Sequence, residues 1–315
     1  MSANMSQDDE LKENIIHWMV ELKKLNNQPF YVHCSNLLTK CKNTLNSLDK
    51  DKEDKKDISV FACSSDALRF LKPYIDYRDQ IEKVIKNESY NHDERQNKLI
   101  DIFKNYKEIA NSNNKKKTKG YYFTPQSKFE STIMEEFLGI FLSPIIKDMK
   151  NIKCGPSKSF LNTSFFVSLN NMSAIATKDT KTKDQDFSIY IEHNSGSNDG
   201  KTVDQIPLIS IECKTYVDKT MLESSISTAN RIKAGTPSSK FYIVTETIDL
   251  GCEQKVGNHE IDNIYVIRKS TRSENAVMCN QVFIDIYEKI DSDINSLKTH
   301  SSLKDKVKNL GRIKL

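Results

Sequence analysis

The spacing of apolar residues changes about one third of the way along the chain, and this change limits the fold more than any other feature. Up to about residue 112, apolar residues recur every three or four positions, as along one face of a helix. Examples are Ile15, Ile16, Met19, Leu22 and Leu25 at the start and Leu99, Ile100, Ile102, Phe103, Tyr106 and Ile109 at the end. Two more helices are expected at residues 30–48 and 65–86. The first third is therefore predicted to be helical.

A polar and basic segment, residues 111–120, follows these helices and ends in Gly120. Such a stretch is typical of a linker. We therefore expect a helical N-terminal region at residues 1–119 and a second domain at residues 120–315. A further helix is expected to begin near Gln126, because Phe129, Ile133, Phe137, Ile140, Phe141 and Ile145 share one helical face.

The second domain contains short apolar runs that are typical of strands. They lie at residues 160–169, 187–191, 207–213, 241–247 and 261–267, with helical patterns at 219–232 and 281–298. Near-continuous apolar strands indicate a sheet that is covered on both faces. Alternation of strands with helices then predicts an α/β fold.

Composition excludes several classes of protein. Only 9 glycines among 315 residues disfavour folds that wrap a cofactor phosphate in a glycine loop. The 7 cysteines form no Cys-x-x-Cys pair, which suggests reduced thiols in a cytoplasmic protein. No apolar run approaches the roughly 18 residues of a membrane helix, and the mildly basic net charge of +4 permits binding to nucleic acid.

One group of charged residues stands out by its position in the predicted sheet. Glu212 and Lys214 end the apolar run 207–211, and residues two apart on a strand project from the same face. If Asp186 lies on the neighbouring strand, two carboxylates and an ammonium group converge at one end of the sheet. Carboxylate oxygens suit Mg²⁺, which also accepts phosphate oxygens of a substrate. This arrangement favours phosphodiester hydrolysis.

The Glu-x-Lys spacing is not specific, because it recurs at Glu10, Glu21, Glu53 and Glu253. What distinguishes Glu212 is its place at the end of a largely apolar strand, where desolvating a charged pair is costly unless the pair is compensated. From spacing and context alone, a catalytic site and an ordinary ion pair at a strand end both remain open.

The residues that carry this constellation resemble a known signature. Asp186 together with Glu212-Cys213-Lys214 resembles the PD-(D/E)xK nuclease motif, and residues 209–222 (ISIECKTYVDKTML) resemble the BbvCI-type type II restriction endonucleases. Residues 122–137 (YFTPQSKFESTIMEEF) are similar to the first core helix of that family. The resemblance covers roughly residues 120–270. It implies a restriction-endonuclease-like core, with a mixed central sheet flanked by helices.

The resemblance also implies roles for individual residues. Asp186 and Glu212 would bind Mg²⁺, and Lys214 would orient the attacking water. Asp184 is an alternative ligand, although the strand 187–191 continues directly from Asp186. Glu136, on the first core helix, would support a metal-bound water or else be a solvated helix residue.

The function implied is cleavage of double-stranded DNA at a short specific sequence, with the helical N-terminal region at residues 1–119 serving DNA contact or dimerisation. Cutting two strands commonly needs two active sites, so one motif per chain implies a homodimer or a heterodimer with a related subunit. Alternatives are a repair or junction-resolving nuclease, a non-catalytic DNA-binding partner subunit, and an RNA-directed nuclease. Two groups of basic residues are candidates for phosphate contacts, or else belong to solvated faces: Lys178, Lys181 and Lys183 before Asp186, and Lys298, Lys304, Lys306, Lys308, Arg312 and Lys314 near the C-terminus.

Overall fold

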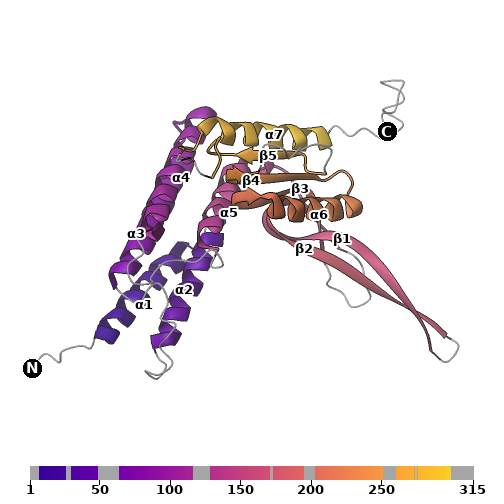
Figure 1. The fold of residues 1–315 in the computed structure, drawn as a ribbon, viewed down its shortest axis with the longest axis horizontal. Coiled ribbons are helices and arrows are strands. Elements are labelled where there is room, and N and C mark those ends of the chain that lie inside the picture. Colours follow the sequence, from indigo (N-terminus) through magenta and orange to yellow (C-terminus); the bar gives the residue numbers. More distant parts are fainter. Residues whose placement is uncertain are drawn as a thin grey trace, which may run out of the picture.

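The computed structural model describes residues 7–25, 30–48, 64–115, 128–170, 173–194, 203–250, 260–272, 274 and 276–298. A group of helices lies on one side of the molecule and a twisted sheet on the other (Figure 1). Within the described ranges, no helix is both long and apolar enough to cross a membrane.

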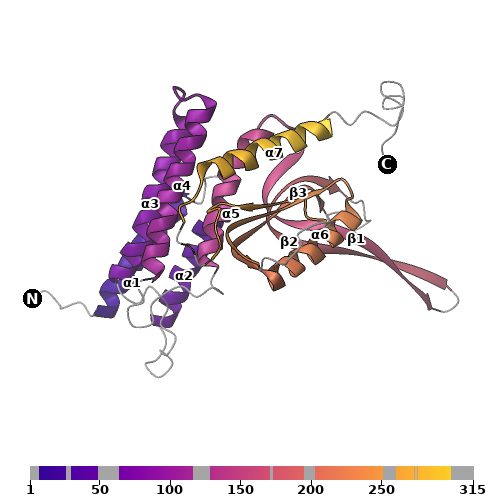
Figure 2. The same ribbon diagram turned by 45° about the horizontal axis from the view of Figure 1, so that its top comes forward.

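Four helices form the N-terminal region: α1 (Gln7–Leu25), α2 (Val32–Leu48), α3 (Ser64–Lys86) and α4 (His92–Lys115). The turn between α3 and α4 ends in a capping box. The backbone N–H of Glu94 donates to the side chain of Asn91 at 2.9 Å, and the N–H of Asn91 donates to the Glu94 carboxylate at 3.1 Å. These reciprocal bonds satisfy donors that a helix start leaves free. Helices α3 and α4 lie side by side (Figures 1 and 2).

Helix α5 (Phe129–Leu142) lies between the four N-terminal helices and the sheet (Figures 1 and 2). Almost all of its residues are buried. It contacts α2 and α4 on one side and β2 and β3 on the other. A helix that is buried all round belongs to the interior of a protein. It is followed by a short 3₁₀ turn, η3 (Ser143–Ile146).

The sheet has five strands in the order β1 (Ile152–Asn170), β2 (Ser173–Asn194), β3 (Val203–Asp218), β4 (Lys240–Asp249) and β5 (Asn263–Val266). Strands β1, β2 and β3 are antiparallel neighbours, whereas β3, β4 and β5 are parallel. Residues along β4 alternate between two apolar clusters. Phe241 and Ile243 join the cluster of α6 (Lys219–Gly235), and Tyr242 and Val244 join that of α5 and α7 (Asn280–Lys298). Helices therefore cover both faces.

Strands β1 and β2 form a ribbon that is longer than the rest of the sheet. Their pairing runs from Ile152↔Ile191 to Asn170↔Ser173, but β3 pairs with β2 only as far as Phe187↔Ile211. The remainder of the ribbon projects away from the sheet (Figures 1 and 2).

The helical region and the sheet share one interior. The largest apolar cluster runs from Ile15 of α1 to Ile294 of α7. Buried charges also join the two parts, because Lys107 of α4 forms a 2.9 Å ion pair with Glu246 of β4. Arg268 bridges the same carboxylate to Glu108 of α4.

The predicted α/β class and the mixed sheet flanked by helices are confirmed. Two expectations need correction. Helix α4 continues through residues 111–115, which were expected to begin a linker, and the long ribbon was not foreseen. The expected division at residues 119 and 120 falls in 116–127, outside the described residues, and stays a prediction.

Candidate active site

The candidate site lies where strand β2 leaves strand β3. Their backbone pairing ends at Phe187↔Ile211, so the next residues are Asp186 on one strand and Glu212 on the other. The β1–β2 register shifts between Gly155 and Ser157, a bulge that bends the ribbon away at this point. The Asp186 carboxylate accepts a 2.9 Å hydrogen bond from the backbone N–H of Cys213. The side chain of one strand thus binds the backbone of the other at the point of separation.

Glu212 and Lys214 project from the same face of β3, as their spacing predicts. The Lys214 Nζ lies 2.8 Å from Glu212 Oε1, with the two side chains 29% and 20% exposed. The second oxygen, Glu212 Oε2, is buried and has no hydrogen-bond partner within the described residues. A buried carboxylate oxygen without a partner is costly, and a bound cation would compensate it.

The charges of the site influence one another. Burial raises the pKa of Asp186, and the nearby Lys214 ammonium opposes that rise. Burial lowers the pKa of Lys214, but the Glu212 carboxylate and, to a smaller extent, Asp186 together raise it above its ordinary value. The lysine therefore stays charged beside a carboxyl group whose pKa is raised, and shifted pKa values of this kind are common at functional sites.

Glu135 of α5 is a site residue that the sequence analysis missed. Its side chain is buried, and its pKa rises to about 7 through burial and, second, through the negative charge of Asp186. Lys214 acts on the same carboxyl group in the opposite direction. Helix α5 contacts β2 and β3, so this third carboxyl group comes from the helix that faces the strand pair. The adjacent glutamates Glu135 and Glu136 were the only signal in the sequence.

Glu136, the residue considered for this role, points elsewhere. It is 1% exposed and forms a 2.9 Å ion pair with Arg78 of α3. Both interpretations of Glu136 therefore need correction. Its carboxylate is buried, not solvated, and it points to α3, not to the strands. Consecutive helix residues lie about 100° apart around the axis, so Glu136 and Glu135 point in different directions.

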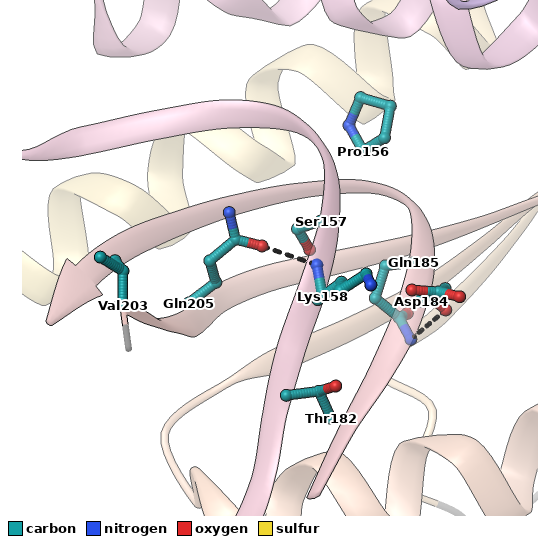
Figure 3. A pocket seen from close by; sticks show the side chains of 8 residues that line it. All are labelled: Pro156, Ser157, Lys158, Thr182, Asp184, Gln185, Val203 and Gln205. Carbon is teal, nitrogen blue, oxygen red and sulfur yellow. Dashed lines mark hydrogen bonds between the residues drawn. The ribbon is translucent and has the colours of Figure 1, made fainter. Parts of the chain in front are cut away.

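Asp184 belongs to a pocket whose lining includes neither Asp186 nor Glu212. It is exposed on β2 and lines this pocket of about 600 Å³ at the base of the ribbon, together with polar side chains such as Lys158 and Gln205 (Figure 3). Gln205 spans this pocket by accepting a 2.6 Å hydrogen bond from the Lys158 backbone N–H. The arrangement favours Asp186 over Asp184 as the partner of Glu212.

Only some of the basic residues considered for phosphate contacts lie in the described part of the chain. Lys183 and Lys181 are exposed on β2, three and five residues before Asp186, which suits a solvated face as well as a phosphate contact. The side chains of Lys178 and Lys298 and the basic C-terminal residues after 298 lie outside the described part of the chain.

The residues of the site fit a magnesium ion. No cluster of three or more His, Cys, Asp or Glu side chains with metal-ligand geometry occurs among the described residues. Magnesium does not need such a cluster, because it keeps several waters and is usually held by one or two carboxylates plus substrate phosphates. Asp186 and Glu212, with its unpartnered Oε2, supply oxygens of this kind.

Comparison with known families identifies the family of the chain. A sequence model of the Bpu10I restriction endonuclease family matches residues 126–301, which is more than half of the chain. The chain belongs to the Bpu10I restriction endonuclease family. Membership assigns it to the nucleases and confirms the resemblance found in the sequence. The family match includes Glu135, Asp186, Glu212 and Lys214.

A solved structure extends the likeness beyond the matched segment. The chain is similar to one in a structure described as the native BbvCI A2B2 tetramer at low resolution, with a TM-score of 0.59 and 22% sequence identity. The alignment covers 87% of this chain and 98% of the other. At this identity the likeness concerns the fold, and its coverage shows that the shared fold extends into the N-terminal helices. A comparison with curated proteins gives no significant match.

Proposed function

We propose that this chain is a Mg²⁺-dependent type II restriction endonuclease that hydrolyses phosphodiester bonds of double-stranded DNA at a short specific sequence. The observation that carries the proposal is the meeting of Asp186, Glu212 and Lys214 where β2 and β3 separate, in a chain of a restriction endonuclease family. Separating strands leave side chains free to meet a DNA backbone that lies across the end of the sheet.

Each residue has a distinct proposed role. Asp186 and Glu212 hold the metal, which would polarise the scissile phosphate and lower the pKa of a bound water. Lys214, kept charged by Glu212, donates hydrogen bonds that orient the attacking water and stabilise developing negative charge. Glu135 forms no three-residue ligand group with Asp186 and Glu212, but its raised pKa suits a group that exchanges a proton near neutral pH.

Double-stranded DNA is the proposed partner, and the assembly follows from the number of sites. One chain carries one Asp/Glu-x-Lys set, so cutting both strands requires a second copy or a related subunit. The relative in the solved structure is described as an A2B2 tetramer, which favours assembly of this kind. The described cysteines are free thiols, in agreement with the proposed action in a reducing cytoplasm.

The first test is incubation of the purified chain with phage DNA and Mg²⁺, beside EDTA and Lys214→Ala controls. Discrete fragments that require Mg²⁺ and disappear in the variant are the expected result. Single-strand nicks without double-strand breaks would indicate that a second subunit is needed. Cleavage at many unrelated positions would instead favour a repair or junction-resolving nuclease of the same fold.

A non-catalytic subunit is the competing function from another class. It predicts that the DNA stays intact even when the related subunit is added, or that Lys214→Ala leaves the activity of the assembled enzyme unchanged. Either result would remove the catalytic roles assigned to Asp186, Glu212 and Lys214.

A further inference from the structure

The carboxylate of Glu136 is the meeting point of three helices. Its Oε1 accepts hydrogen bonds from Tyr74 and Arg78 of α3, both at 2.9 Å. Its Oε2 accepts from the backbone N–H groups of His33 at 2.9 Å and Cys34 at 3.3 Å. Four donors from α2 and α3 thus converge on one buried side chain of α5.

This carboxylate also completes the start of α2. Helix α2 begins at Val32, so His33 and Cys34 belong to its first turn, where backbone N–H groups lack partners within the helix. A negative charge is favourable at this end of a helix. Glu136 therefore acts as a cap for α2 from a different part of the chain.

Other contacts hold the same helices together. Arg78 also donates to the backbone oxygen of Phe30 at 2.7 Å, just before α2. The ring of Phe30 lies so close to Gly139 of α5 that a Cβ there would be 2.4 Å from it. His33 bonds Thr132 of α5 at 2.9 Å and Tyr106 of α4 at 2.8 Å. The position of α5 is thus fixed along its length by the helical region.

Glu135, the neighbour of Glu136, belongs to the candidate active site. It lies on the helix that contacts β2 and β3, and its carboxyl group interacts electrostatically with Asp186 and Lys214. Because the helix is rigid and the two residues are consecutive, the direction of Glu136 determines the direction of Glu135. Rotation of α5 about its axis would break the four bonds to Glu136 and move Glu135 away from β2 and β3. Buried ion pairs add little stability compared with apolar replacements, so stability alone is a poor account of Arg78 and Glu136.

We propose that the helical N-terminal region positions the active site through α5. In this inference, which rests on the proposed function, Arg78 and Glu136 are positioning residues. They hold the helix in the rotation at which Glu135 faces Asp186 and Lys214. The region expected to serve DNA contact or dimerisation thereby also has a part in catalysis.

The test uses the full chain, with its partner subunit where one is needed, and variants of graded severity. Tyr74→Phe removes a single hydrogen bond to Glu136. Arg78→Met removes the ion pair, and Arg78→Lys restores the charge alone. Lys72→Ala is the matched control, because Lys72 pairs with Asp76 on the exposed side of the same helix at 3.3 Å.

Activity and metal binding are both measured. For Arg78→Met we expect kcat to fall by on the order of 10- to 100-fold with KM for DNA unchanged, since small misplacements of catalytic groups have effects of this size. Half-saturating Mg²⁺, from cleavage and from calorimetry without DNA, should rise several-fold. Arg78→Lys should recover part of both changes, and Tyr74→Phe should show a smaller change in the same direction.

A double variant separates positioning from general damage. If Arg78 acts through Glu135, adding Arg78→Met to Glu135→Gln should cause little further loss of kcat, because residues acting through one another are not additive. Melting curves confirm that each variant is folded at the assay temperature. If Arg78→Met does not fold, Tyr74→Phe and its combination with Glu135→Gln decide.

The outcomes distinguish this inference from the proposed function. If the wild type cuts DNA and the folded Arg78 and Tyr74 variants match it in kcat and Mg²⁺ requirement, the positioning role is wrong and the proposed function stands. Fully additive losses with Glu135→Gln would also overturn it. If the wild type with its partner neither cuts DNA nor binds Mg²⁺, the proposed function fails, and this inference fails with it.

Discussion

The carboxylate of Asp186 binds the backbone N–H of Cys213 across the point where their two strands separate. Cys213 lies between Glu212 and Lys214, so this single bond holds the Asp186 carboxylate next to the segment that carries both of them. It also provides a partner for a backbone donor at the end of the β2–β3 pairing. The Asp186 side chain thus forms the last contact between the two strands and is also part of the candidate site.

Replacement of Lys214 by alanine should abolish cleavage but not folding. The side chain is partly exposed, and the loss of its ion pair should change stability little. Removing a charge that stabilises the transition state should lower kcat by about 10³-fold. Lys153→Ala is the matched control, because Lys153 forms a 2.7 Å pair with Glu192 on a neighbouring strand. Equal effects of the two substitutions on plasmid cleavage would contradict the role of Lys214.

Asparagine substitutions should separate Asp186 from Asp184. Asp186→Asn keeps an oxygen for the Cys213 N–H but loses the charge, so we expect a folded protein without Mg²⁺-dependent cleavage. Asp184→Asn changes an exposed residue of the pocket, and most of the cleavage rate should remain. The measurement is the cleavage rate over a Mg²⁺ titration. The reverse pattern would make Asp184 the ligand.

The stability of the metal-free protein should depend on pH through Glu135. Its pKa is about 7 when folded and near the ordinary 4.5 when unfolded. The stabilising contribution is complete below pH 4.5 and is lost as the pH rises to about 7. Glu135→Gln should therefore be more stable than the wild type at pH 8, by up to about 3 kcal/mol, and not at pH 4. Urea unfolding in EDTA at both pH values tests this, and a constant difference would argue against it.

Substitution of Gly235 should disturb the contact of α6 with β1. A Cβ at this position would lie 1.6 Å from the carbonyl oxygen of Leu161. Neither backbone can move away cheaply, so Gly235→Ala should lower the free energy of unfolding by about 1–3 kcal/mol. Chemical denaturation measures this directly. Ala234→Gly makes the opposite exchange at the preceding position of α6 and measures the effect of helix propensity, which for Gly235→Ala is favourable. An unchanged or raised free energy of unfolding for Gly235→Ala would therefore contradict the contact.

The fold was largely predictable where burial imposes a pattern. The strands that contain residues 207–213 and 241–247 are covered on both faces, and their apolar runs show it. The ribbon was missed because residues 178–184 of β2 are polar or charged throughout. Backbone pairing with β1 makes them a strand, and pairing leaves no periodic signature when neither face is buried.

The site was only partly predictable for a related reason. Glu212 and Lys214 follow from the two-residue period of a strand, and the end of an apolar run marks where the strand leaves the interior. Glu135 lies on a helix whose residues are buried on all sides. Because both Glu135 and Glu136 are buried, the spacing of apolar residues does not show which of the two faces the sheet.

The place of α5 between the helices and the sheet has a consequence for how such enzymes diversify. A recombination event that exchanged only the segment after Phe129 between two relatives would join α5 to α2 and α3 helices that had not changed along with it. Glu136 would then face foreign donors, and Phe30 a different surface. The N-terminal helices and the segment from Phe129 onward should therefore be exchangeable between relatives only together.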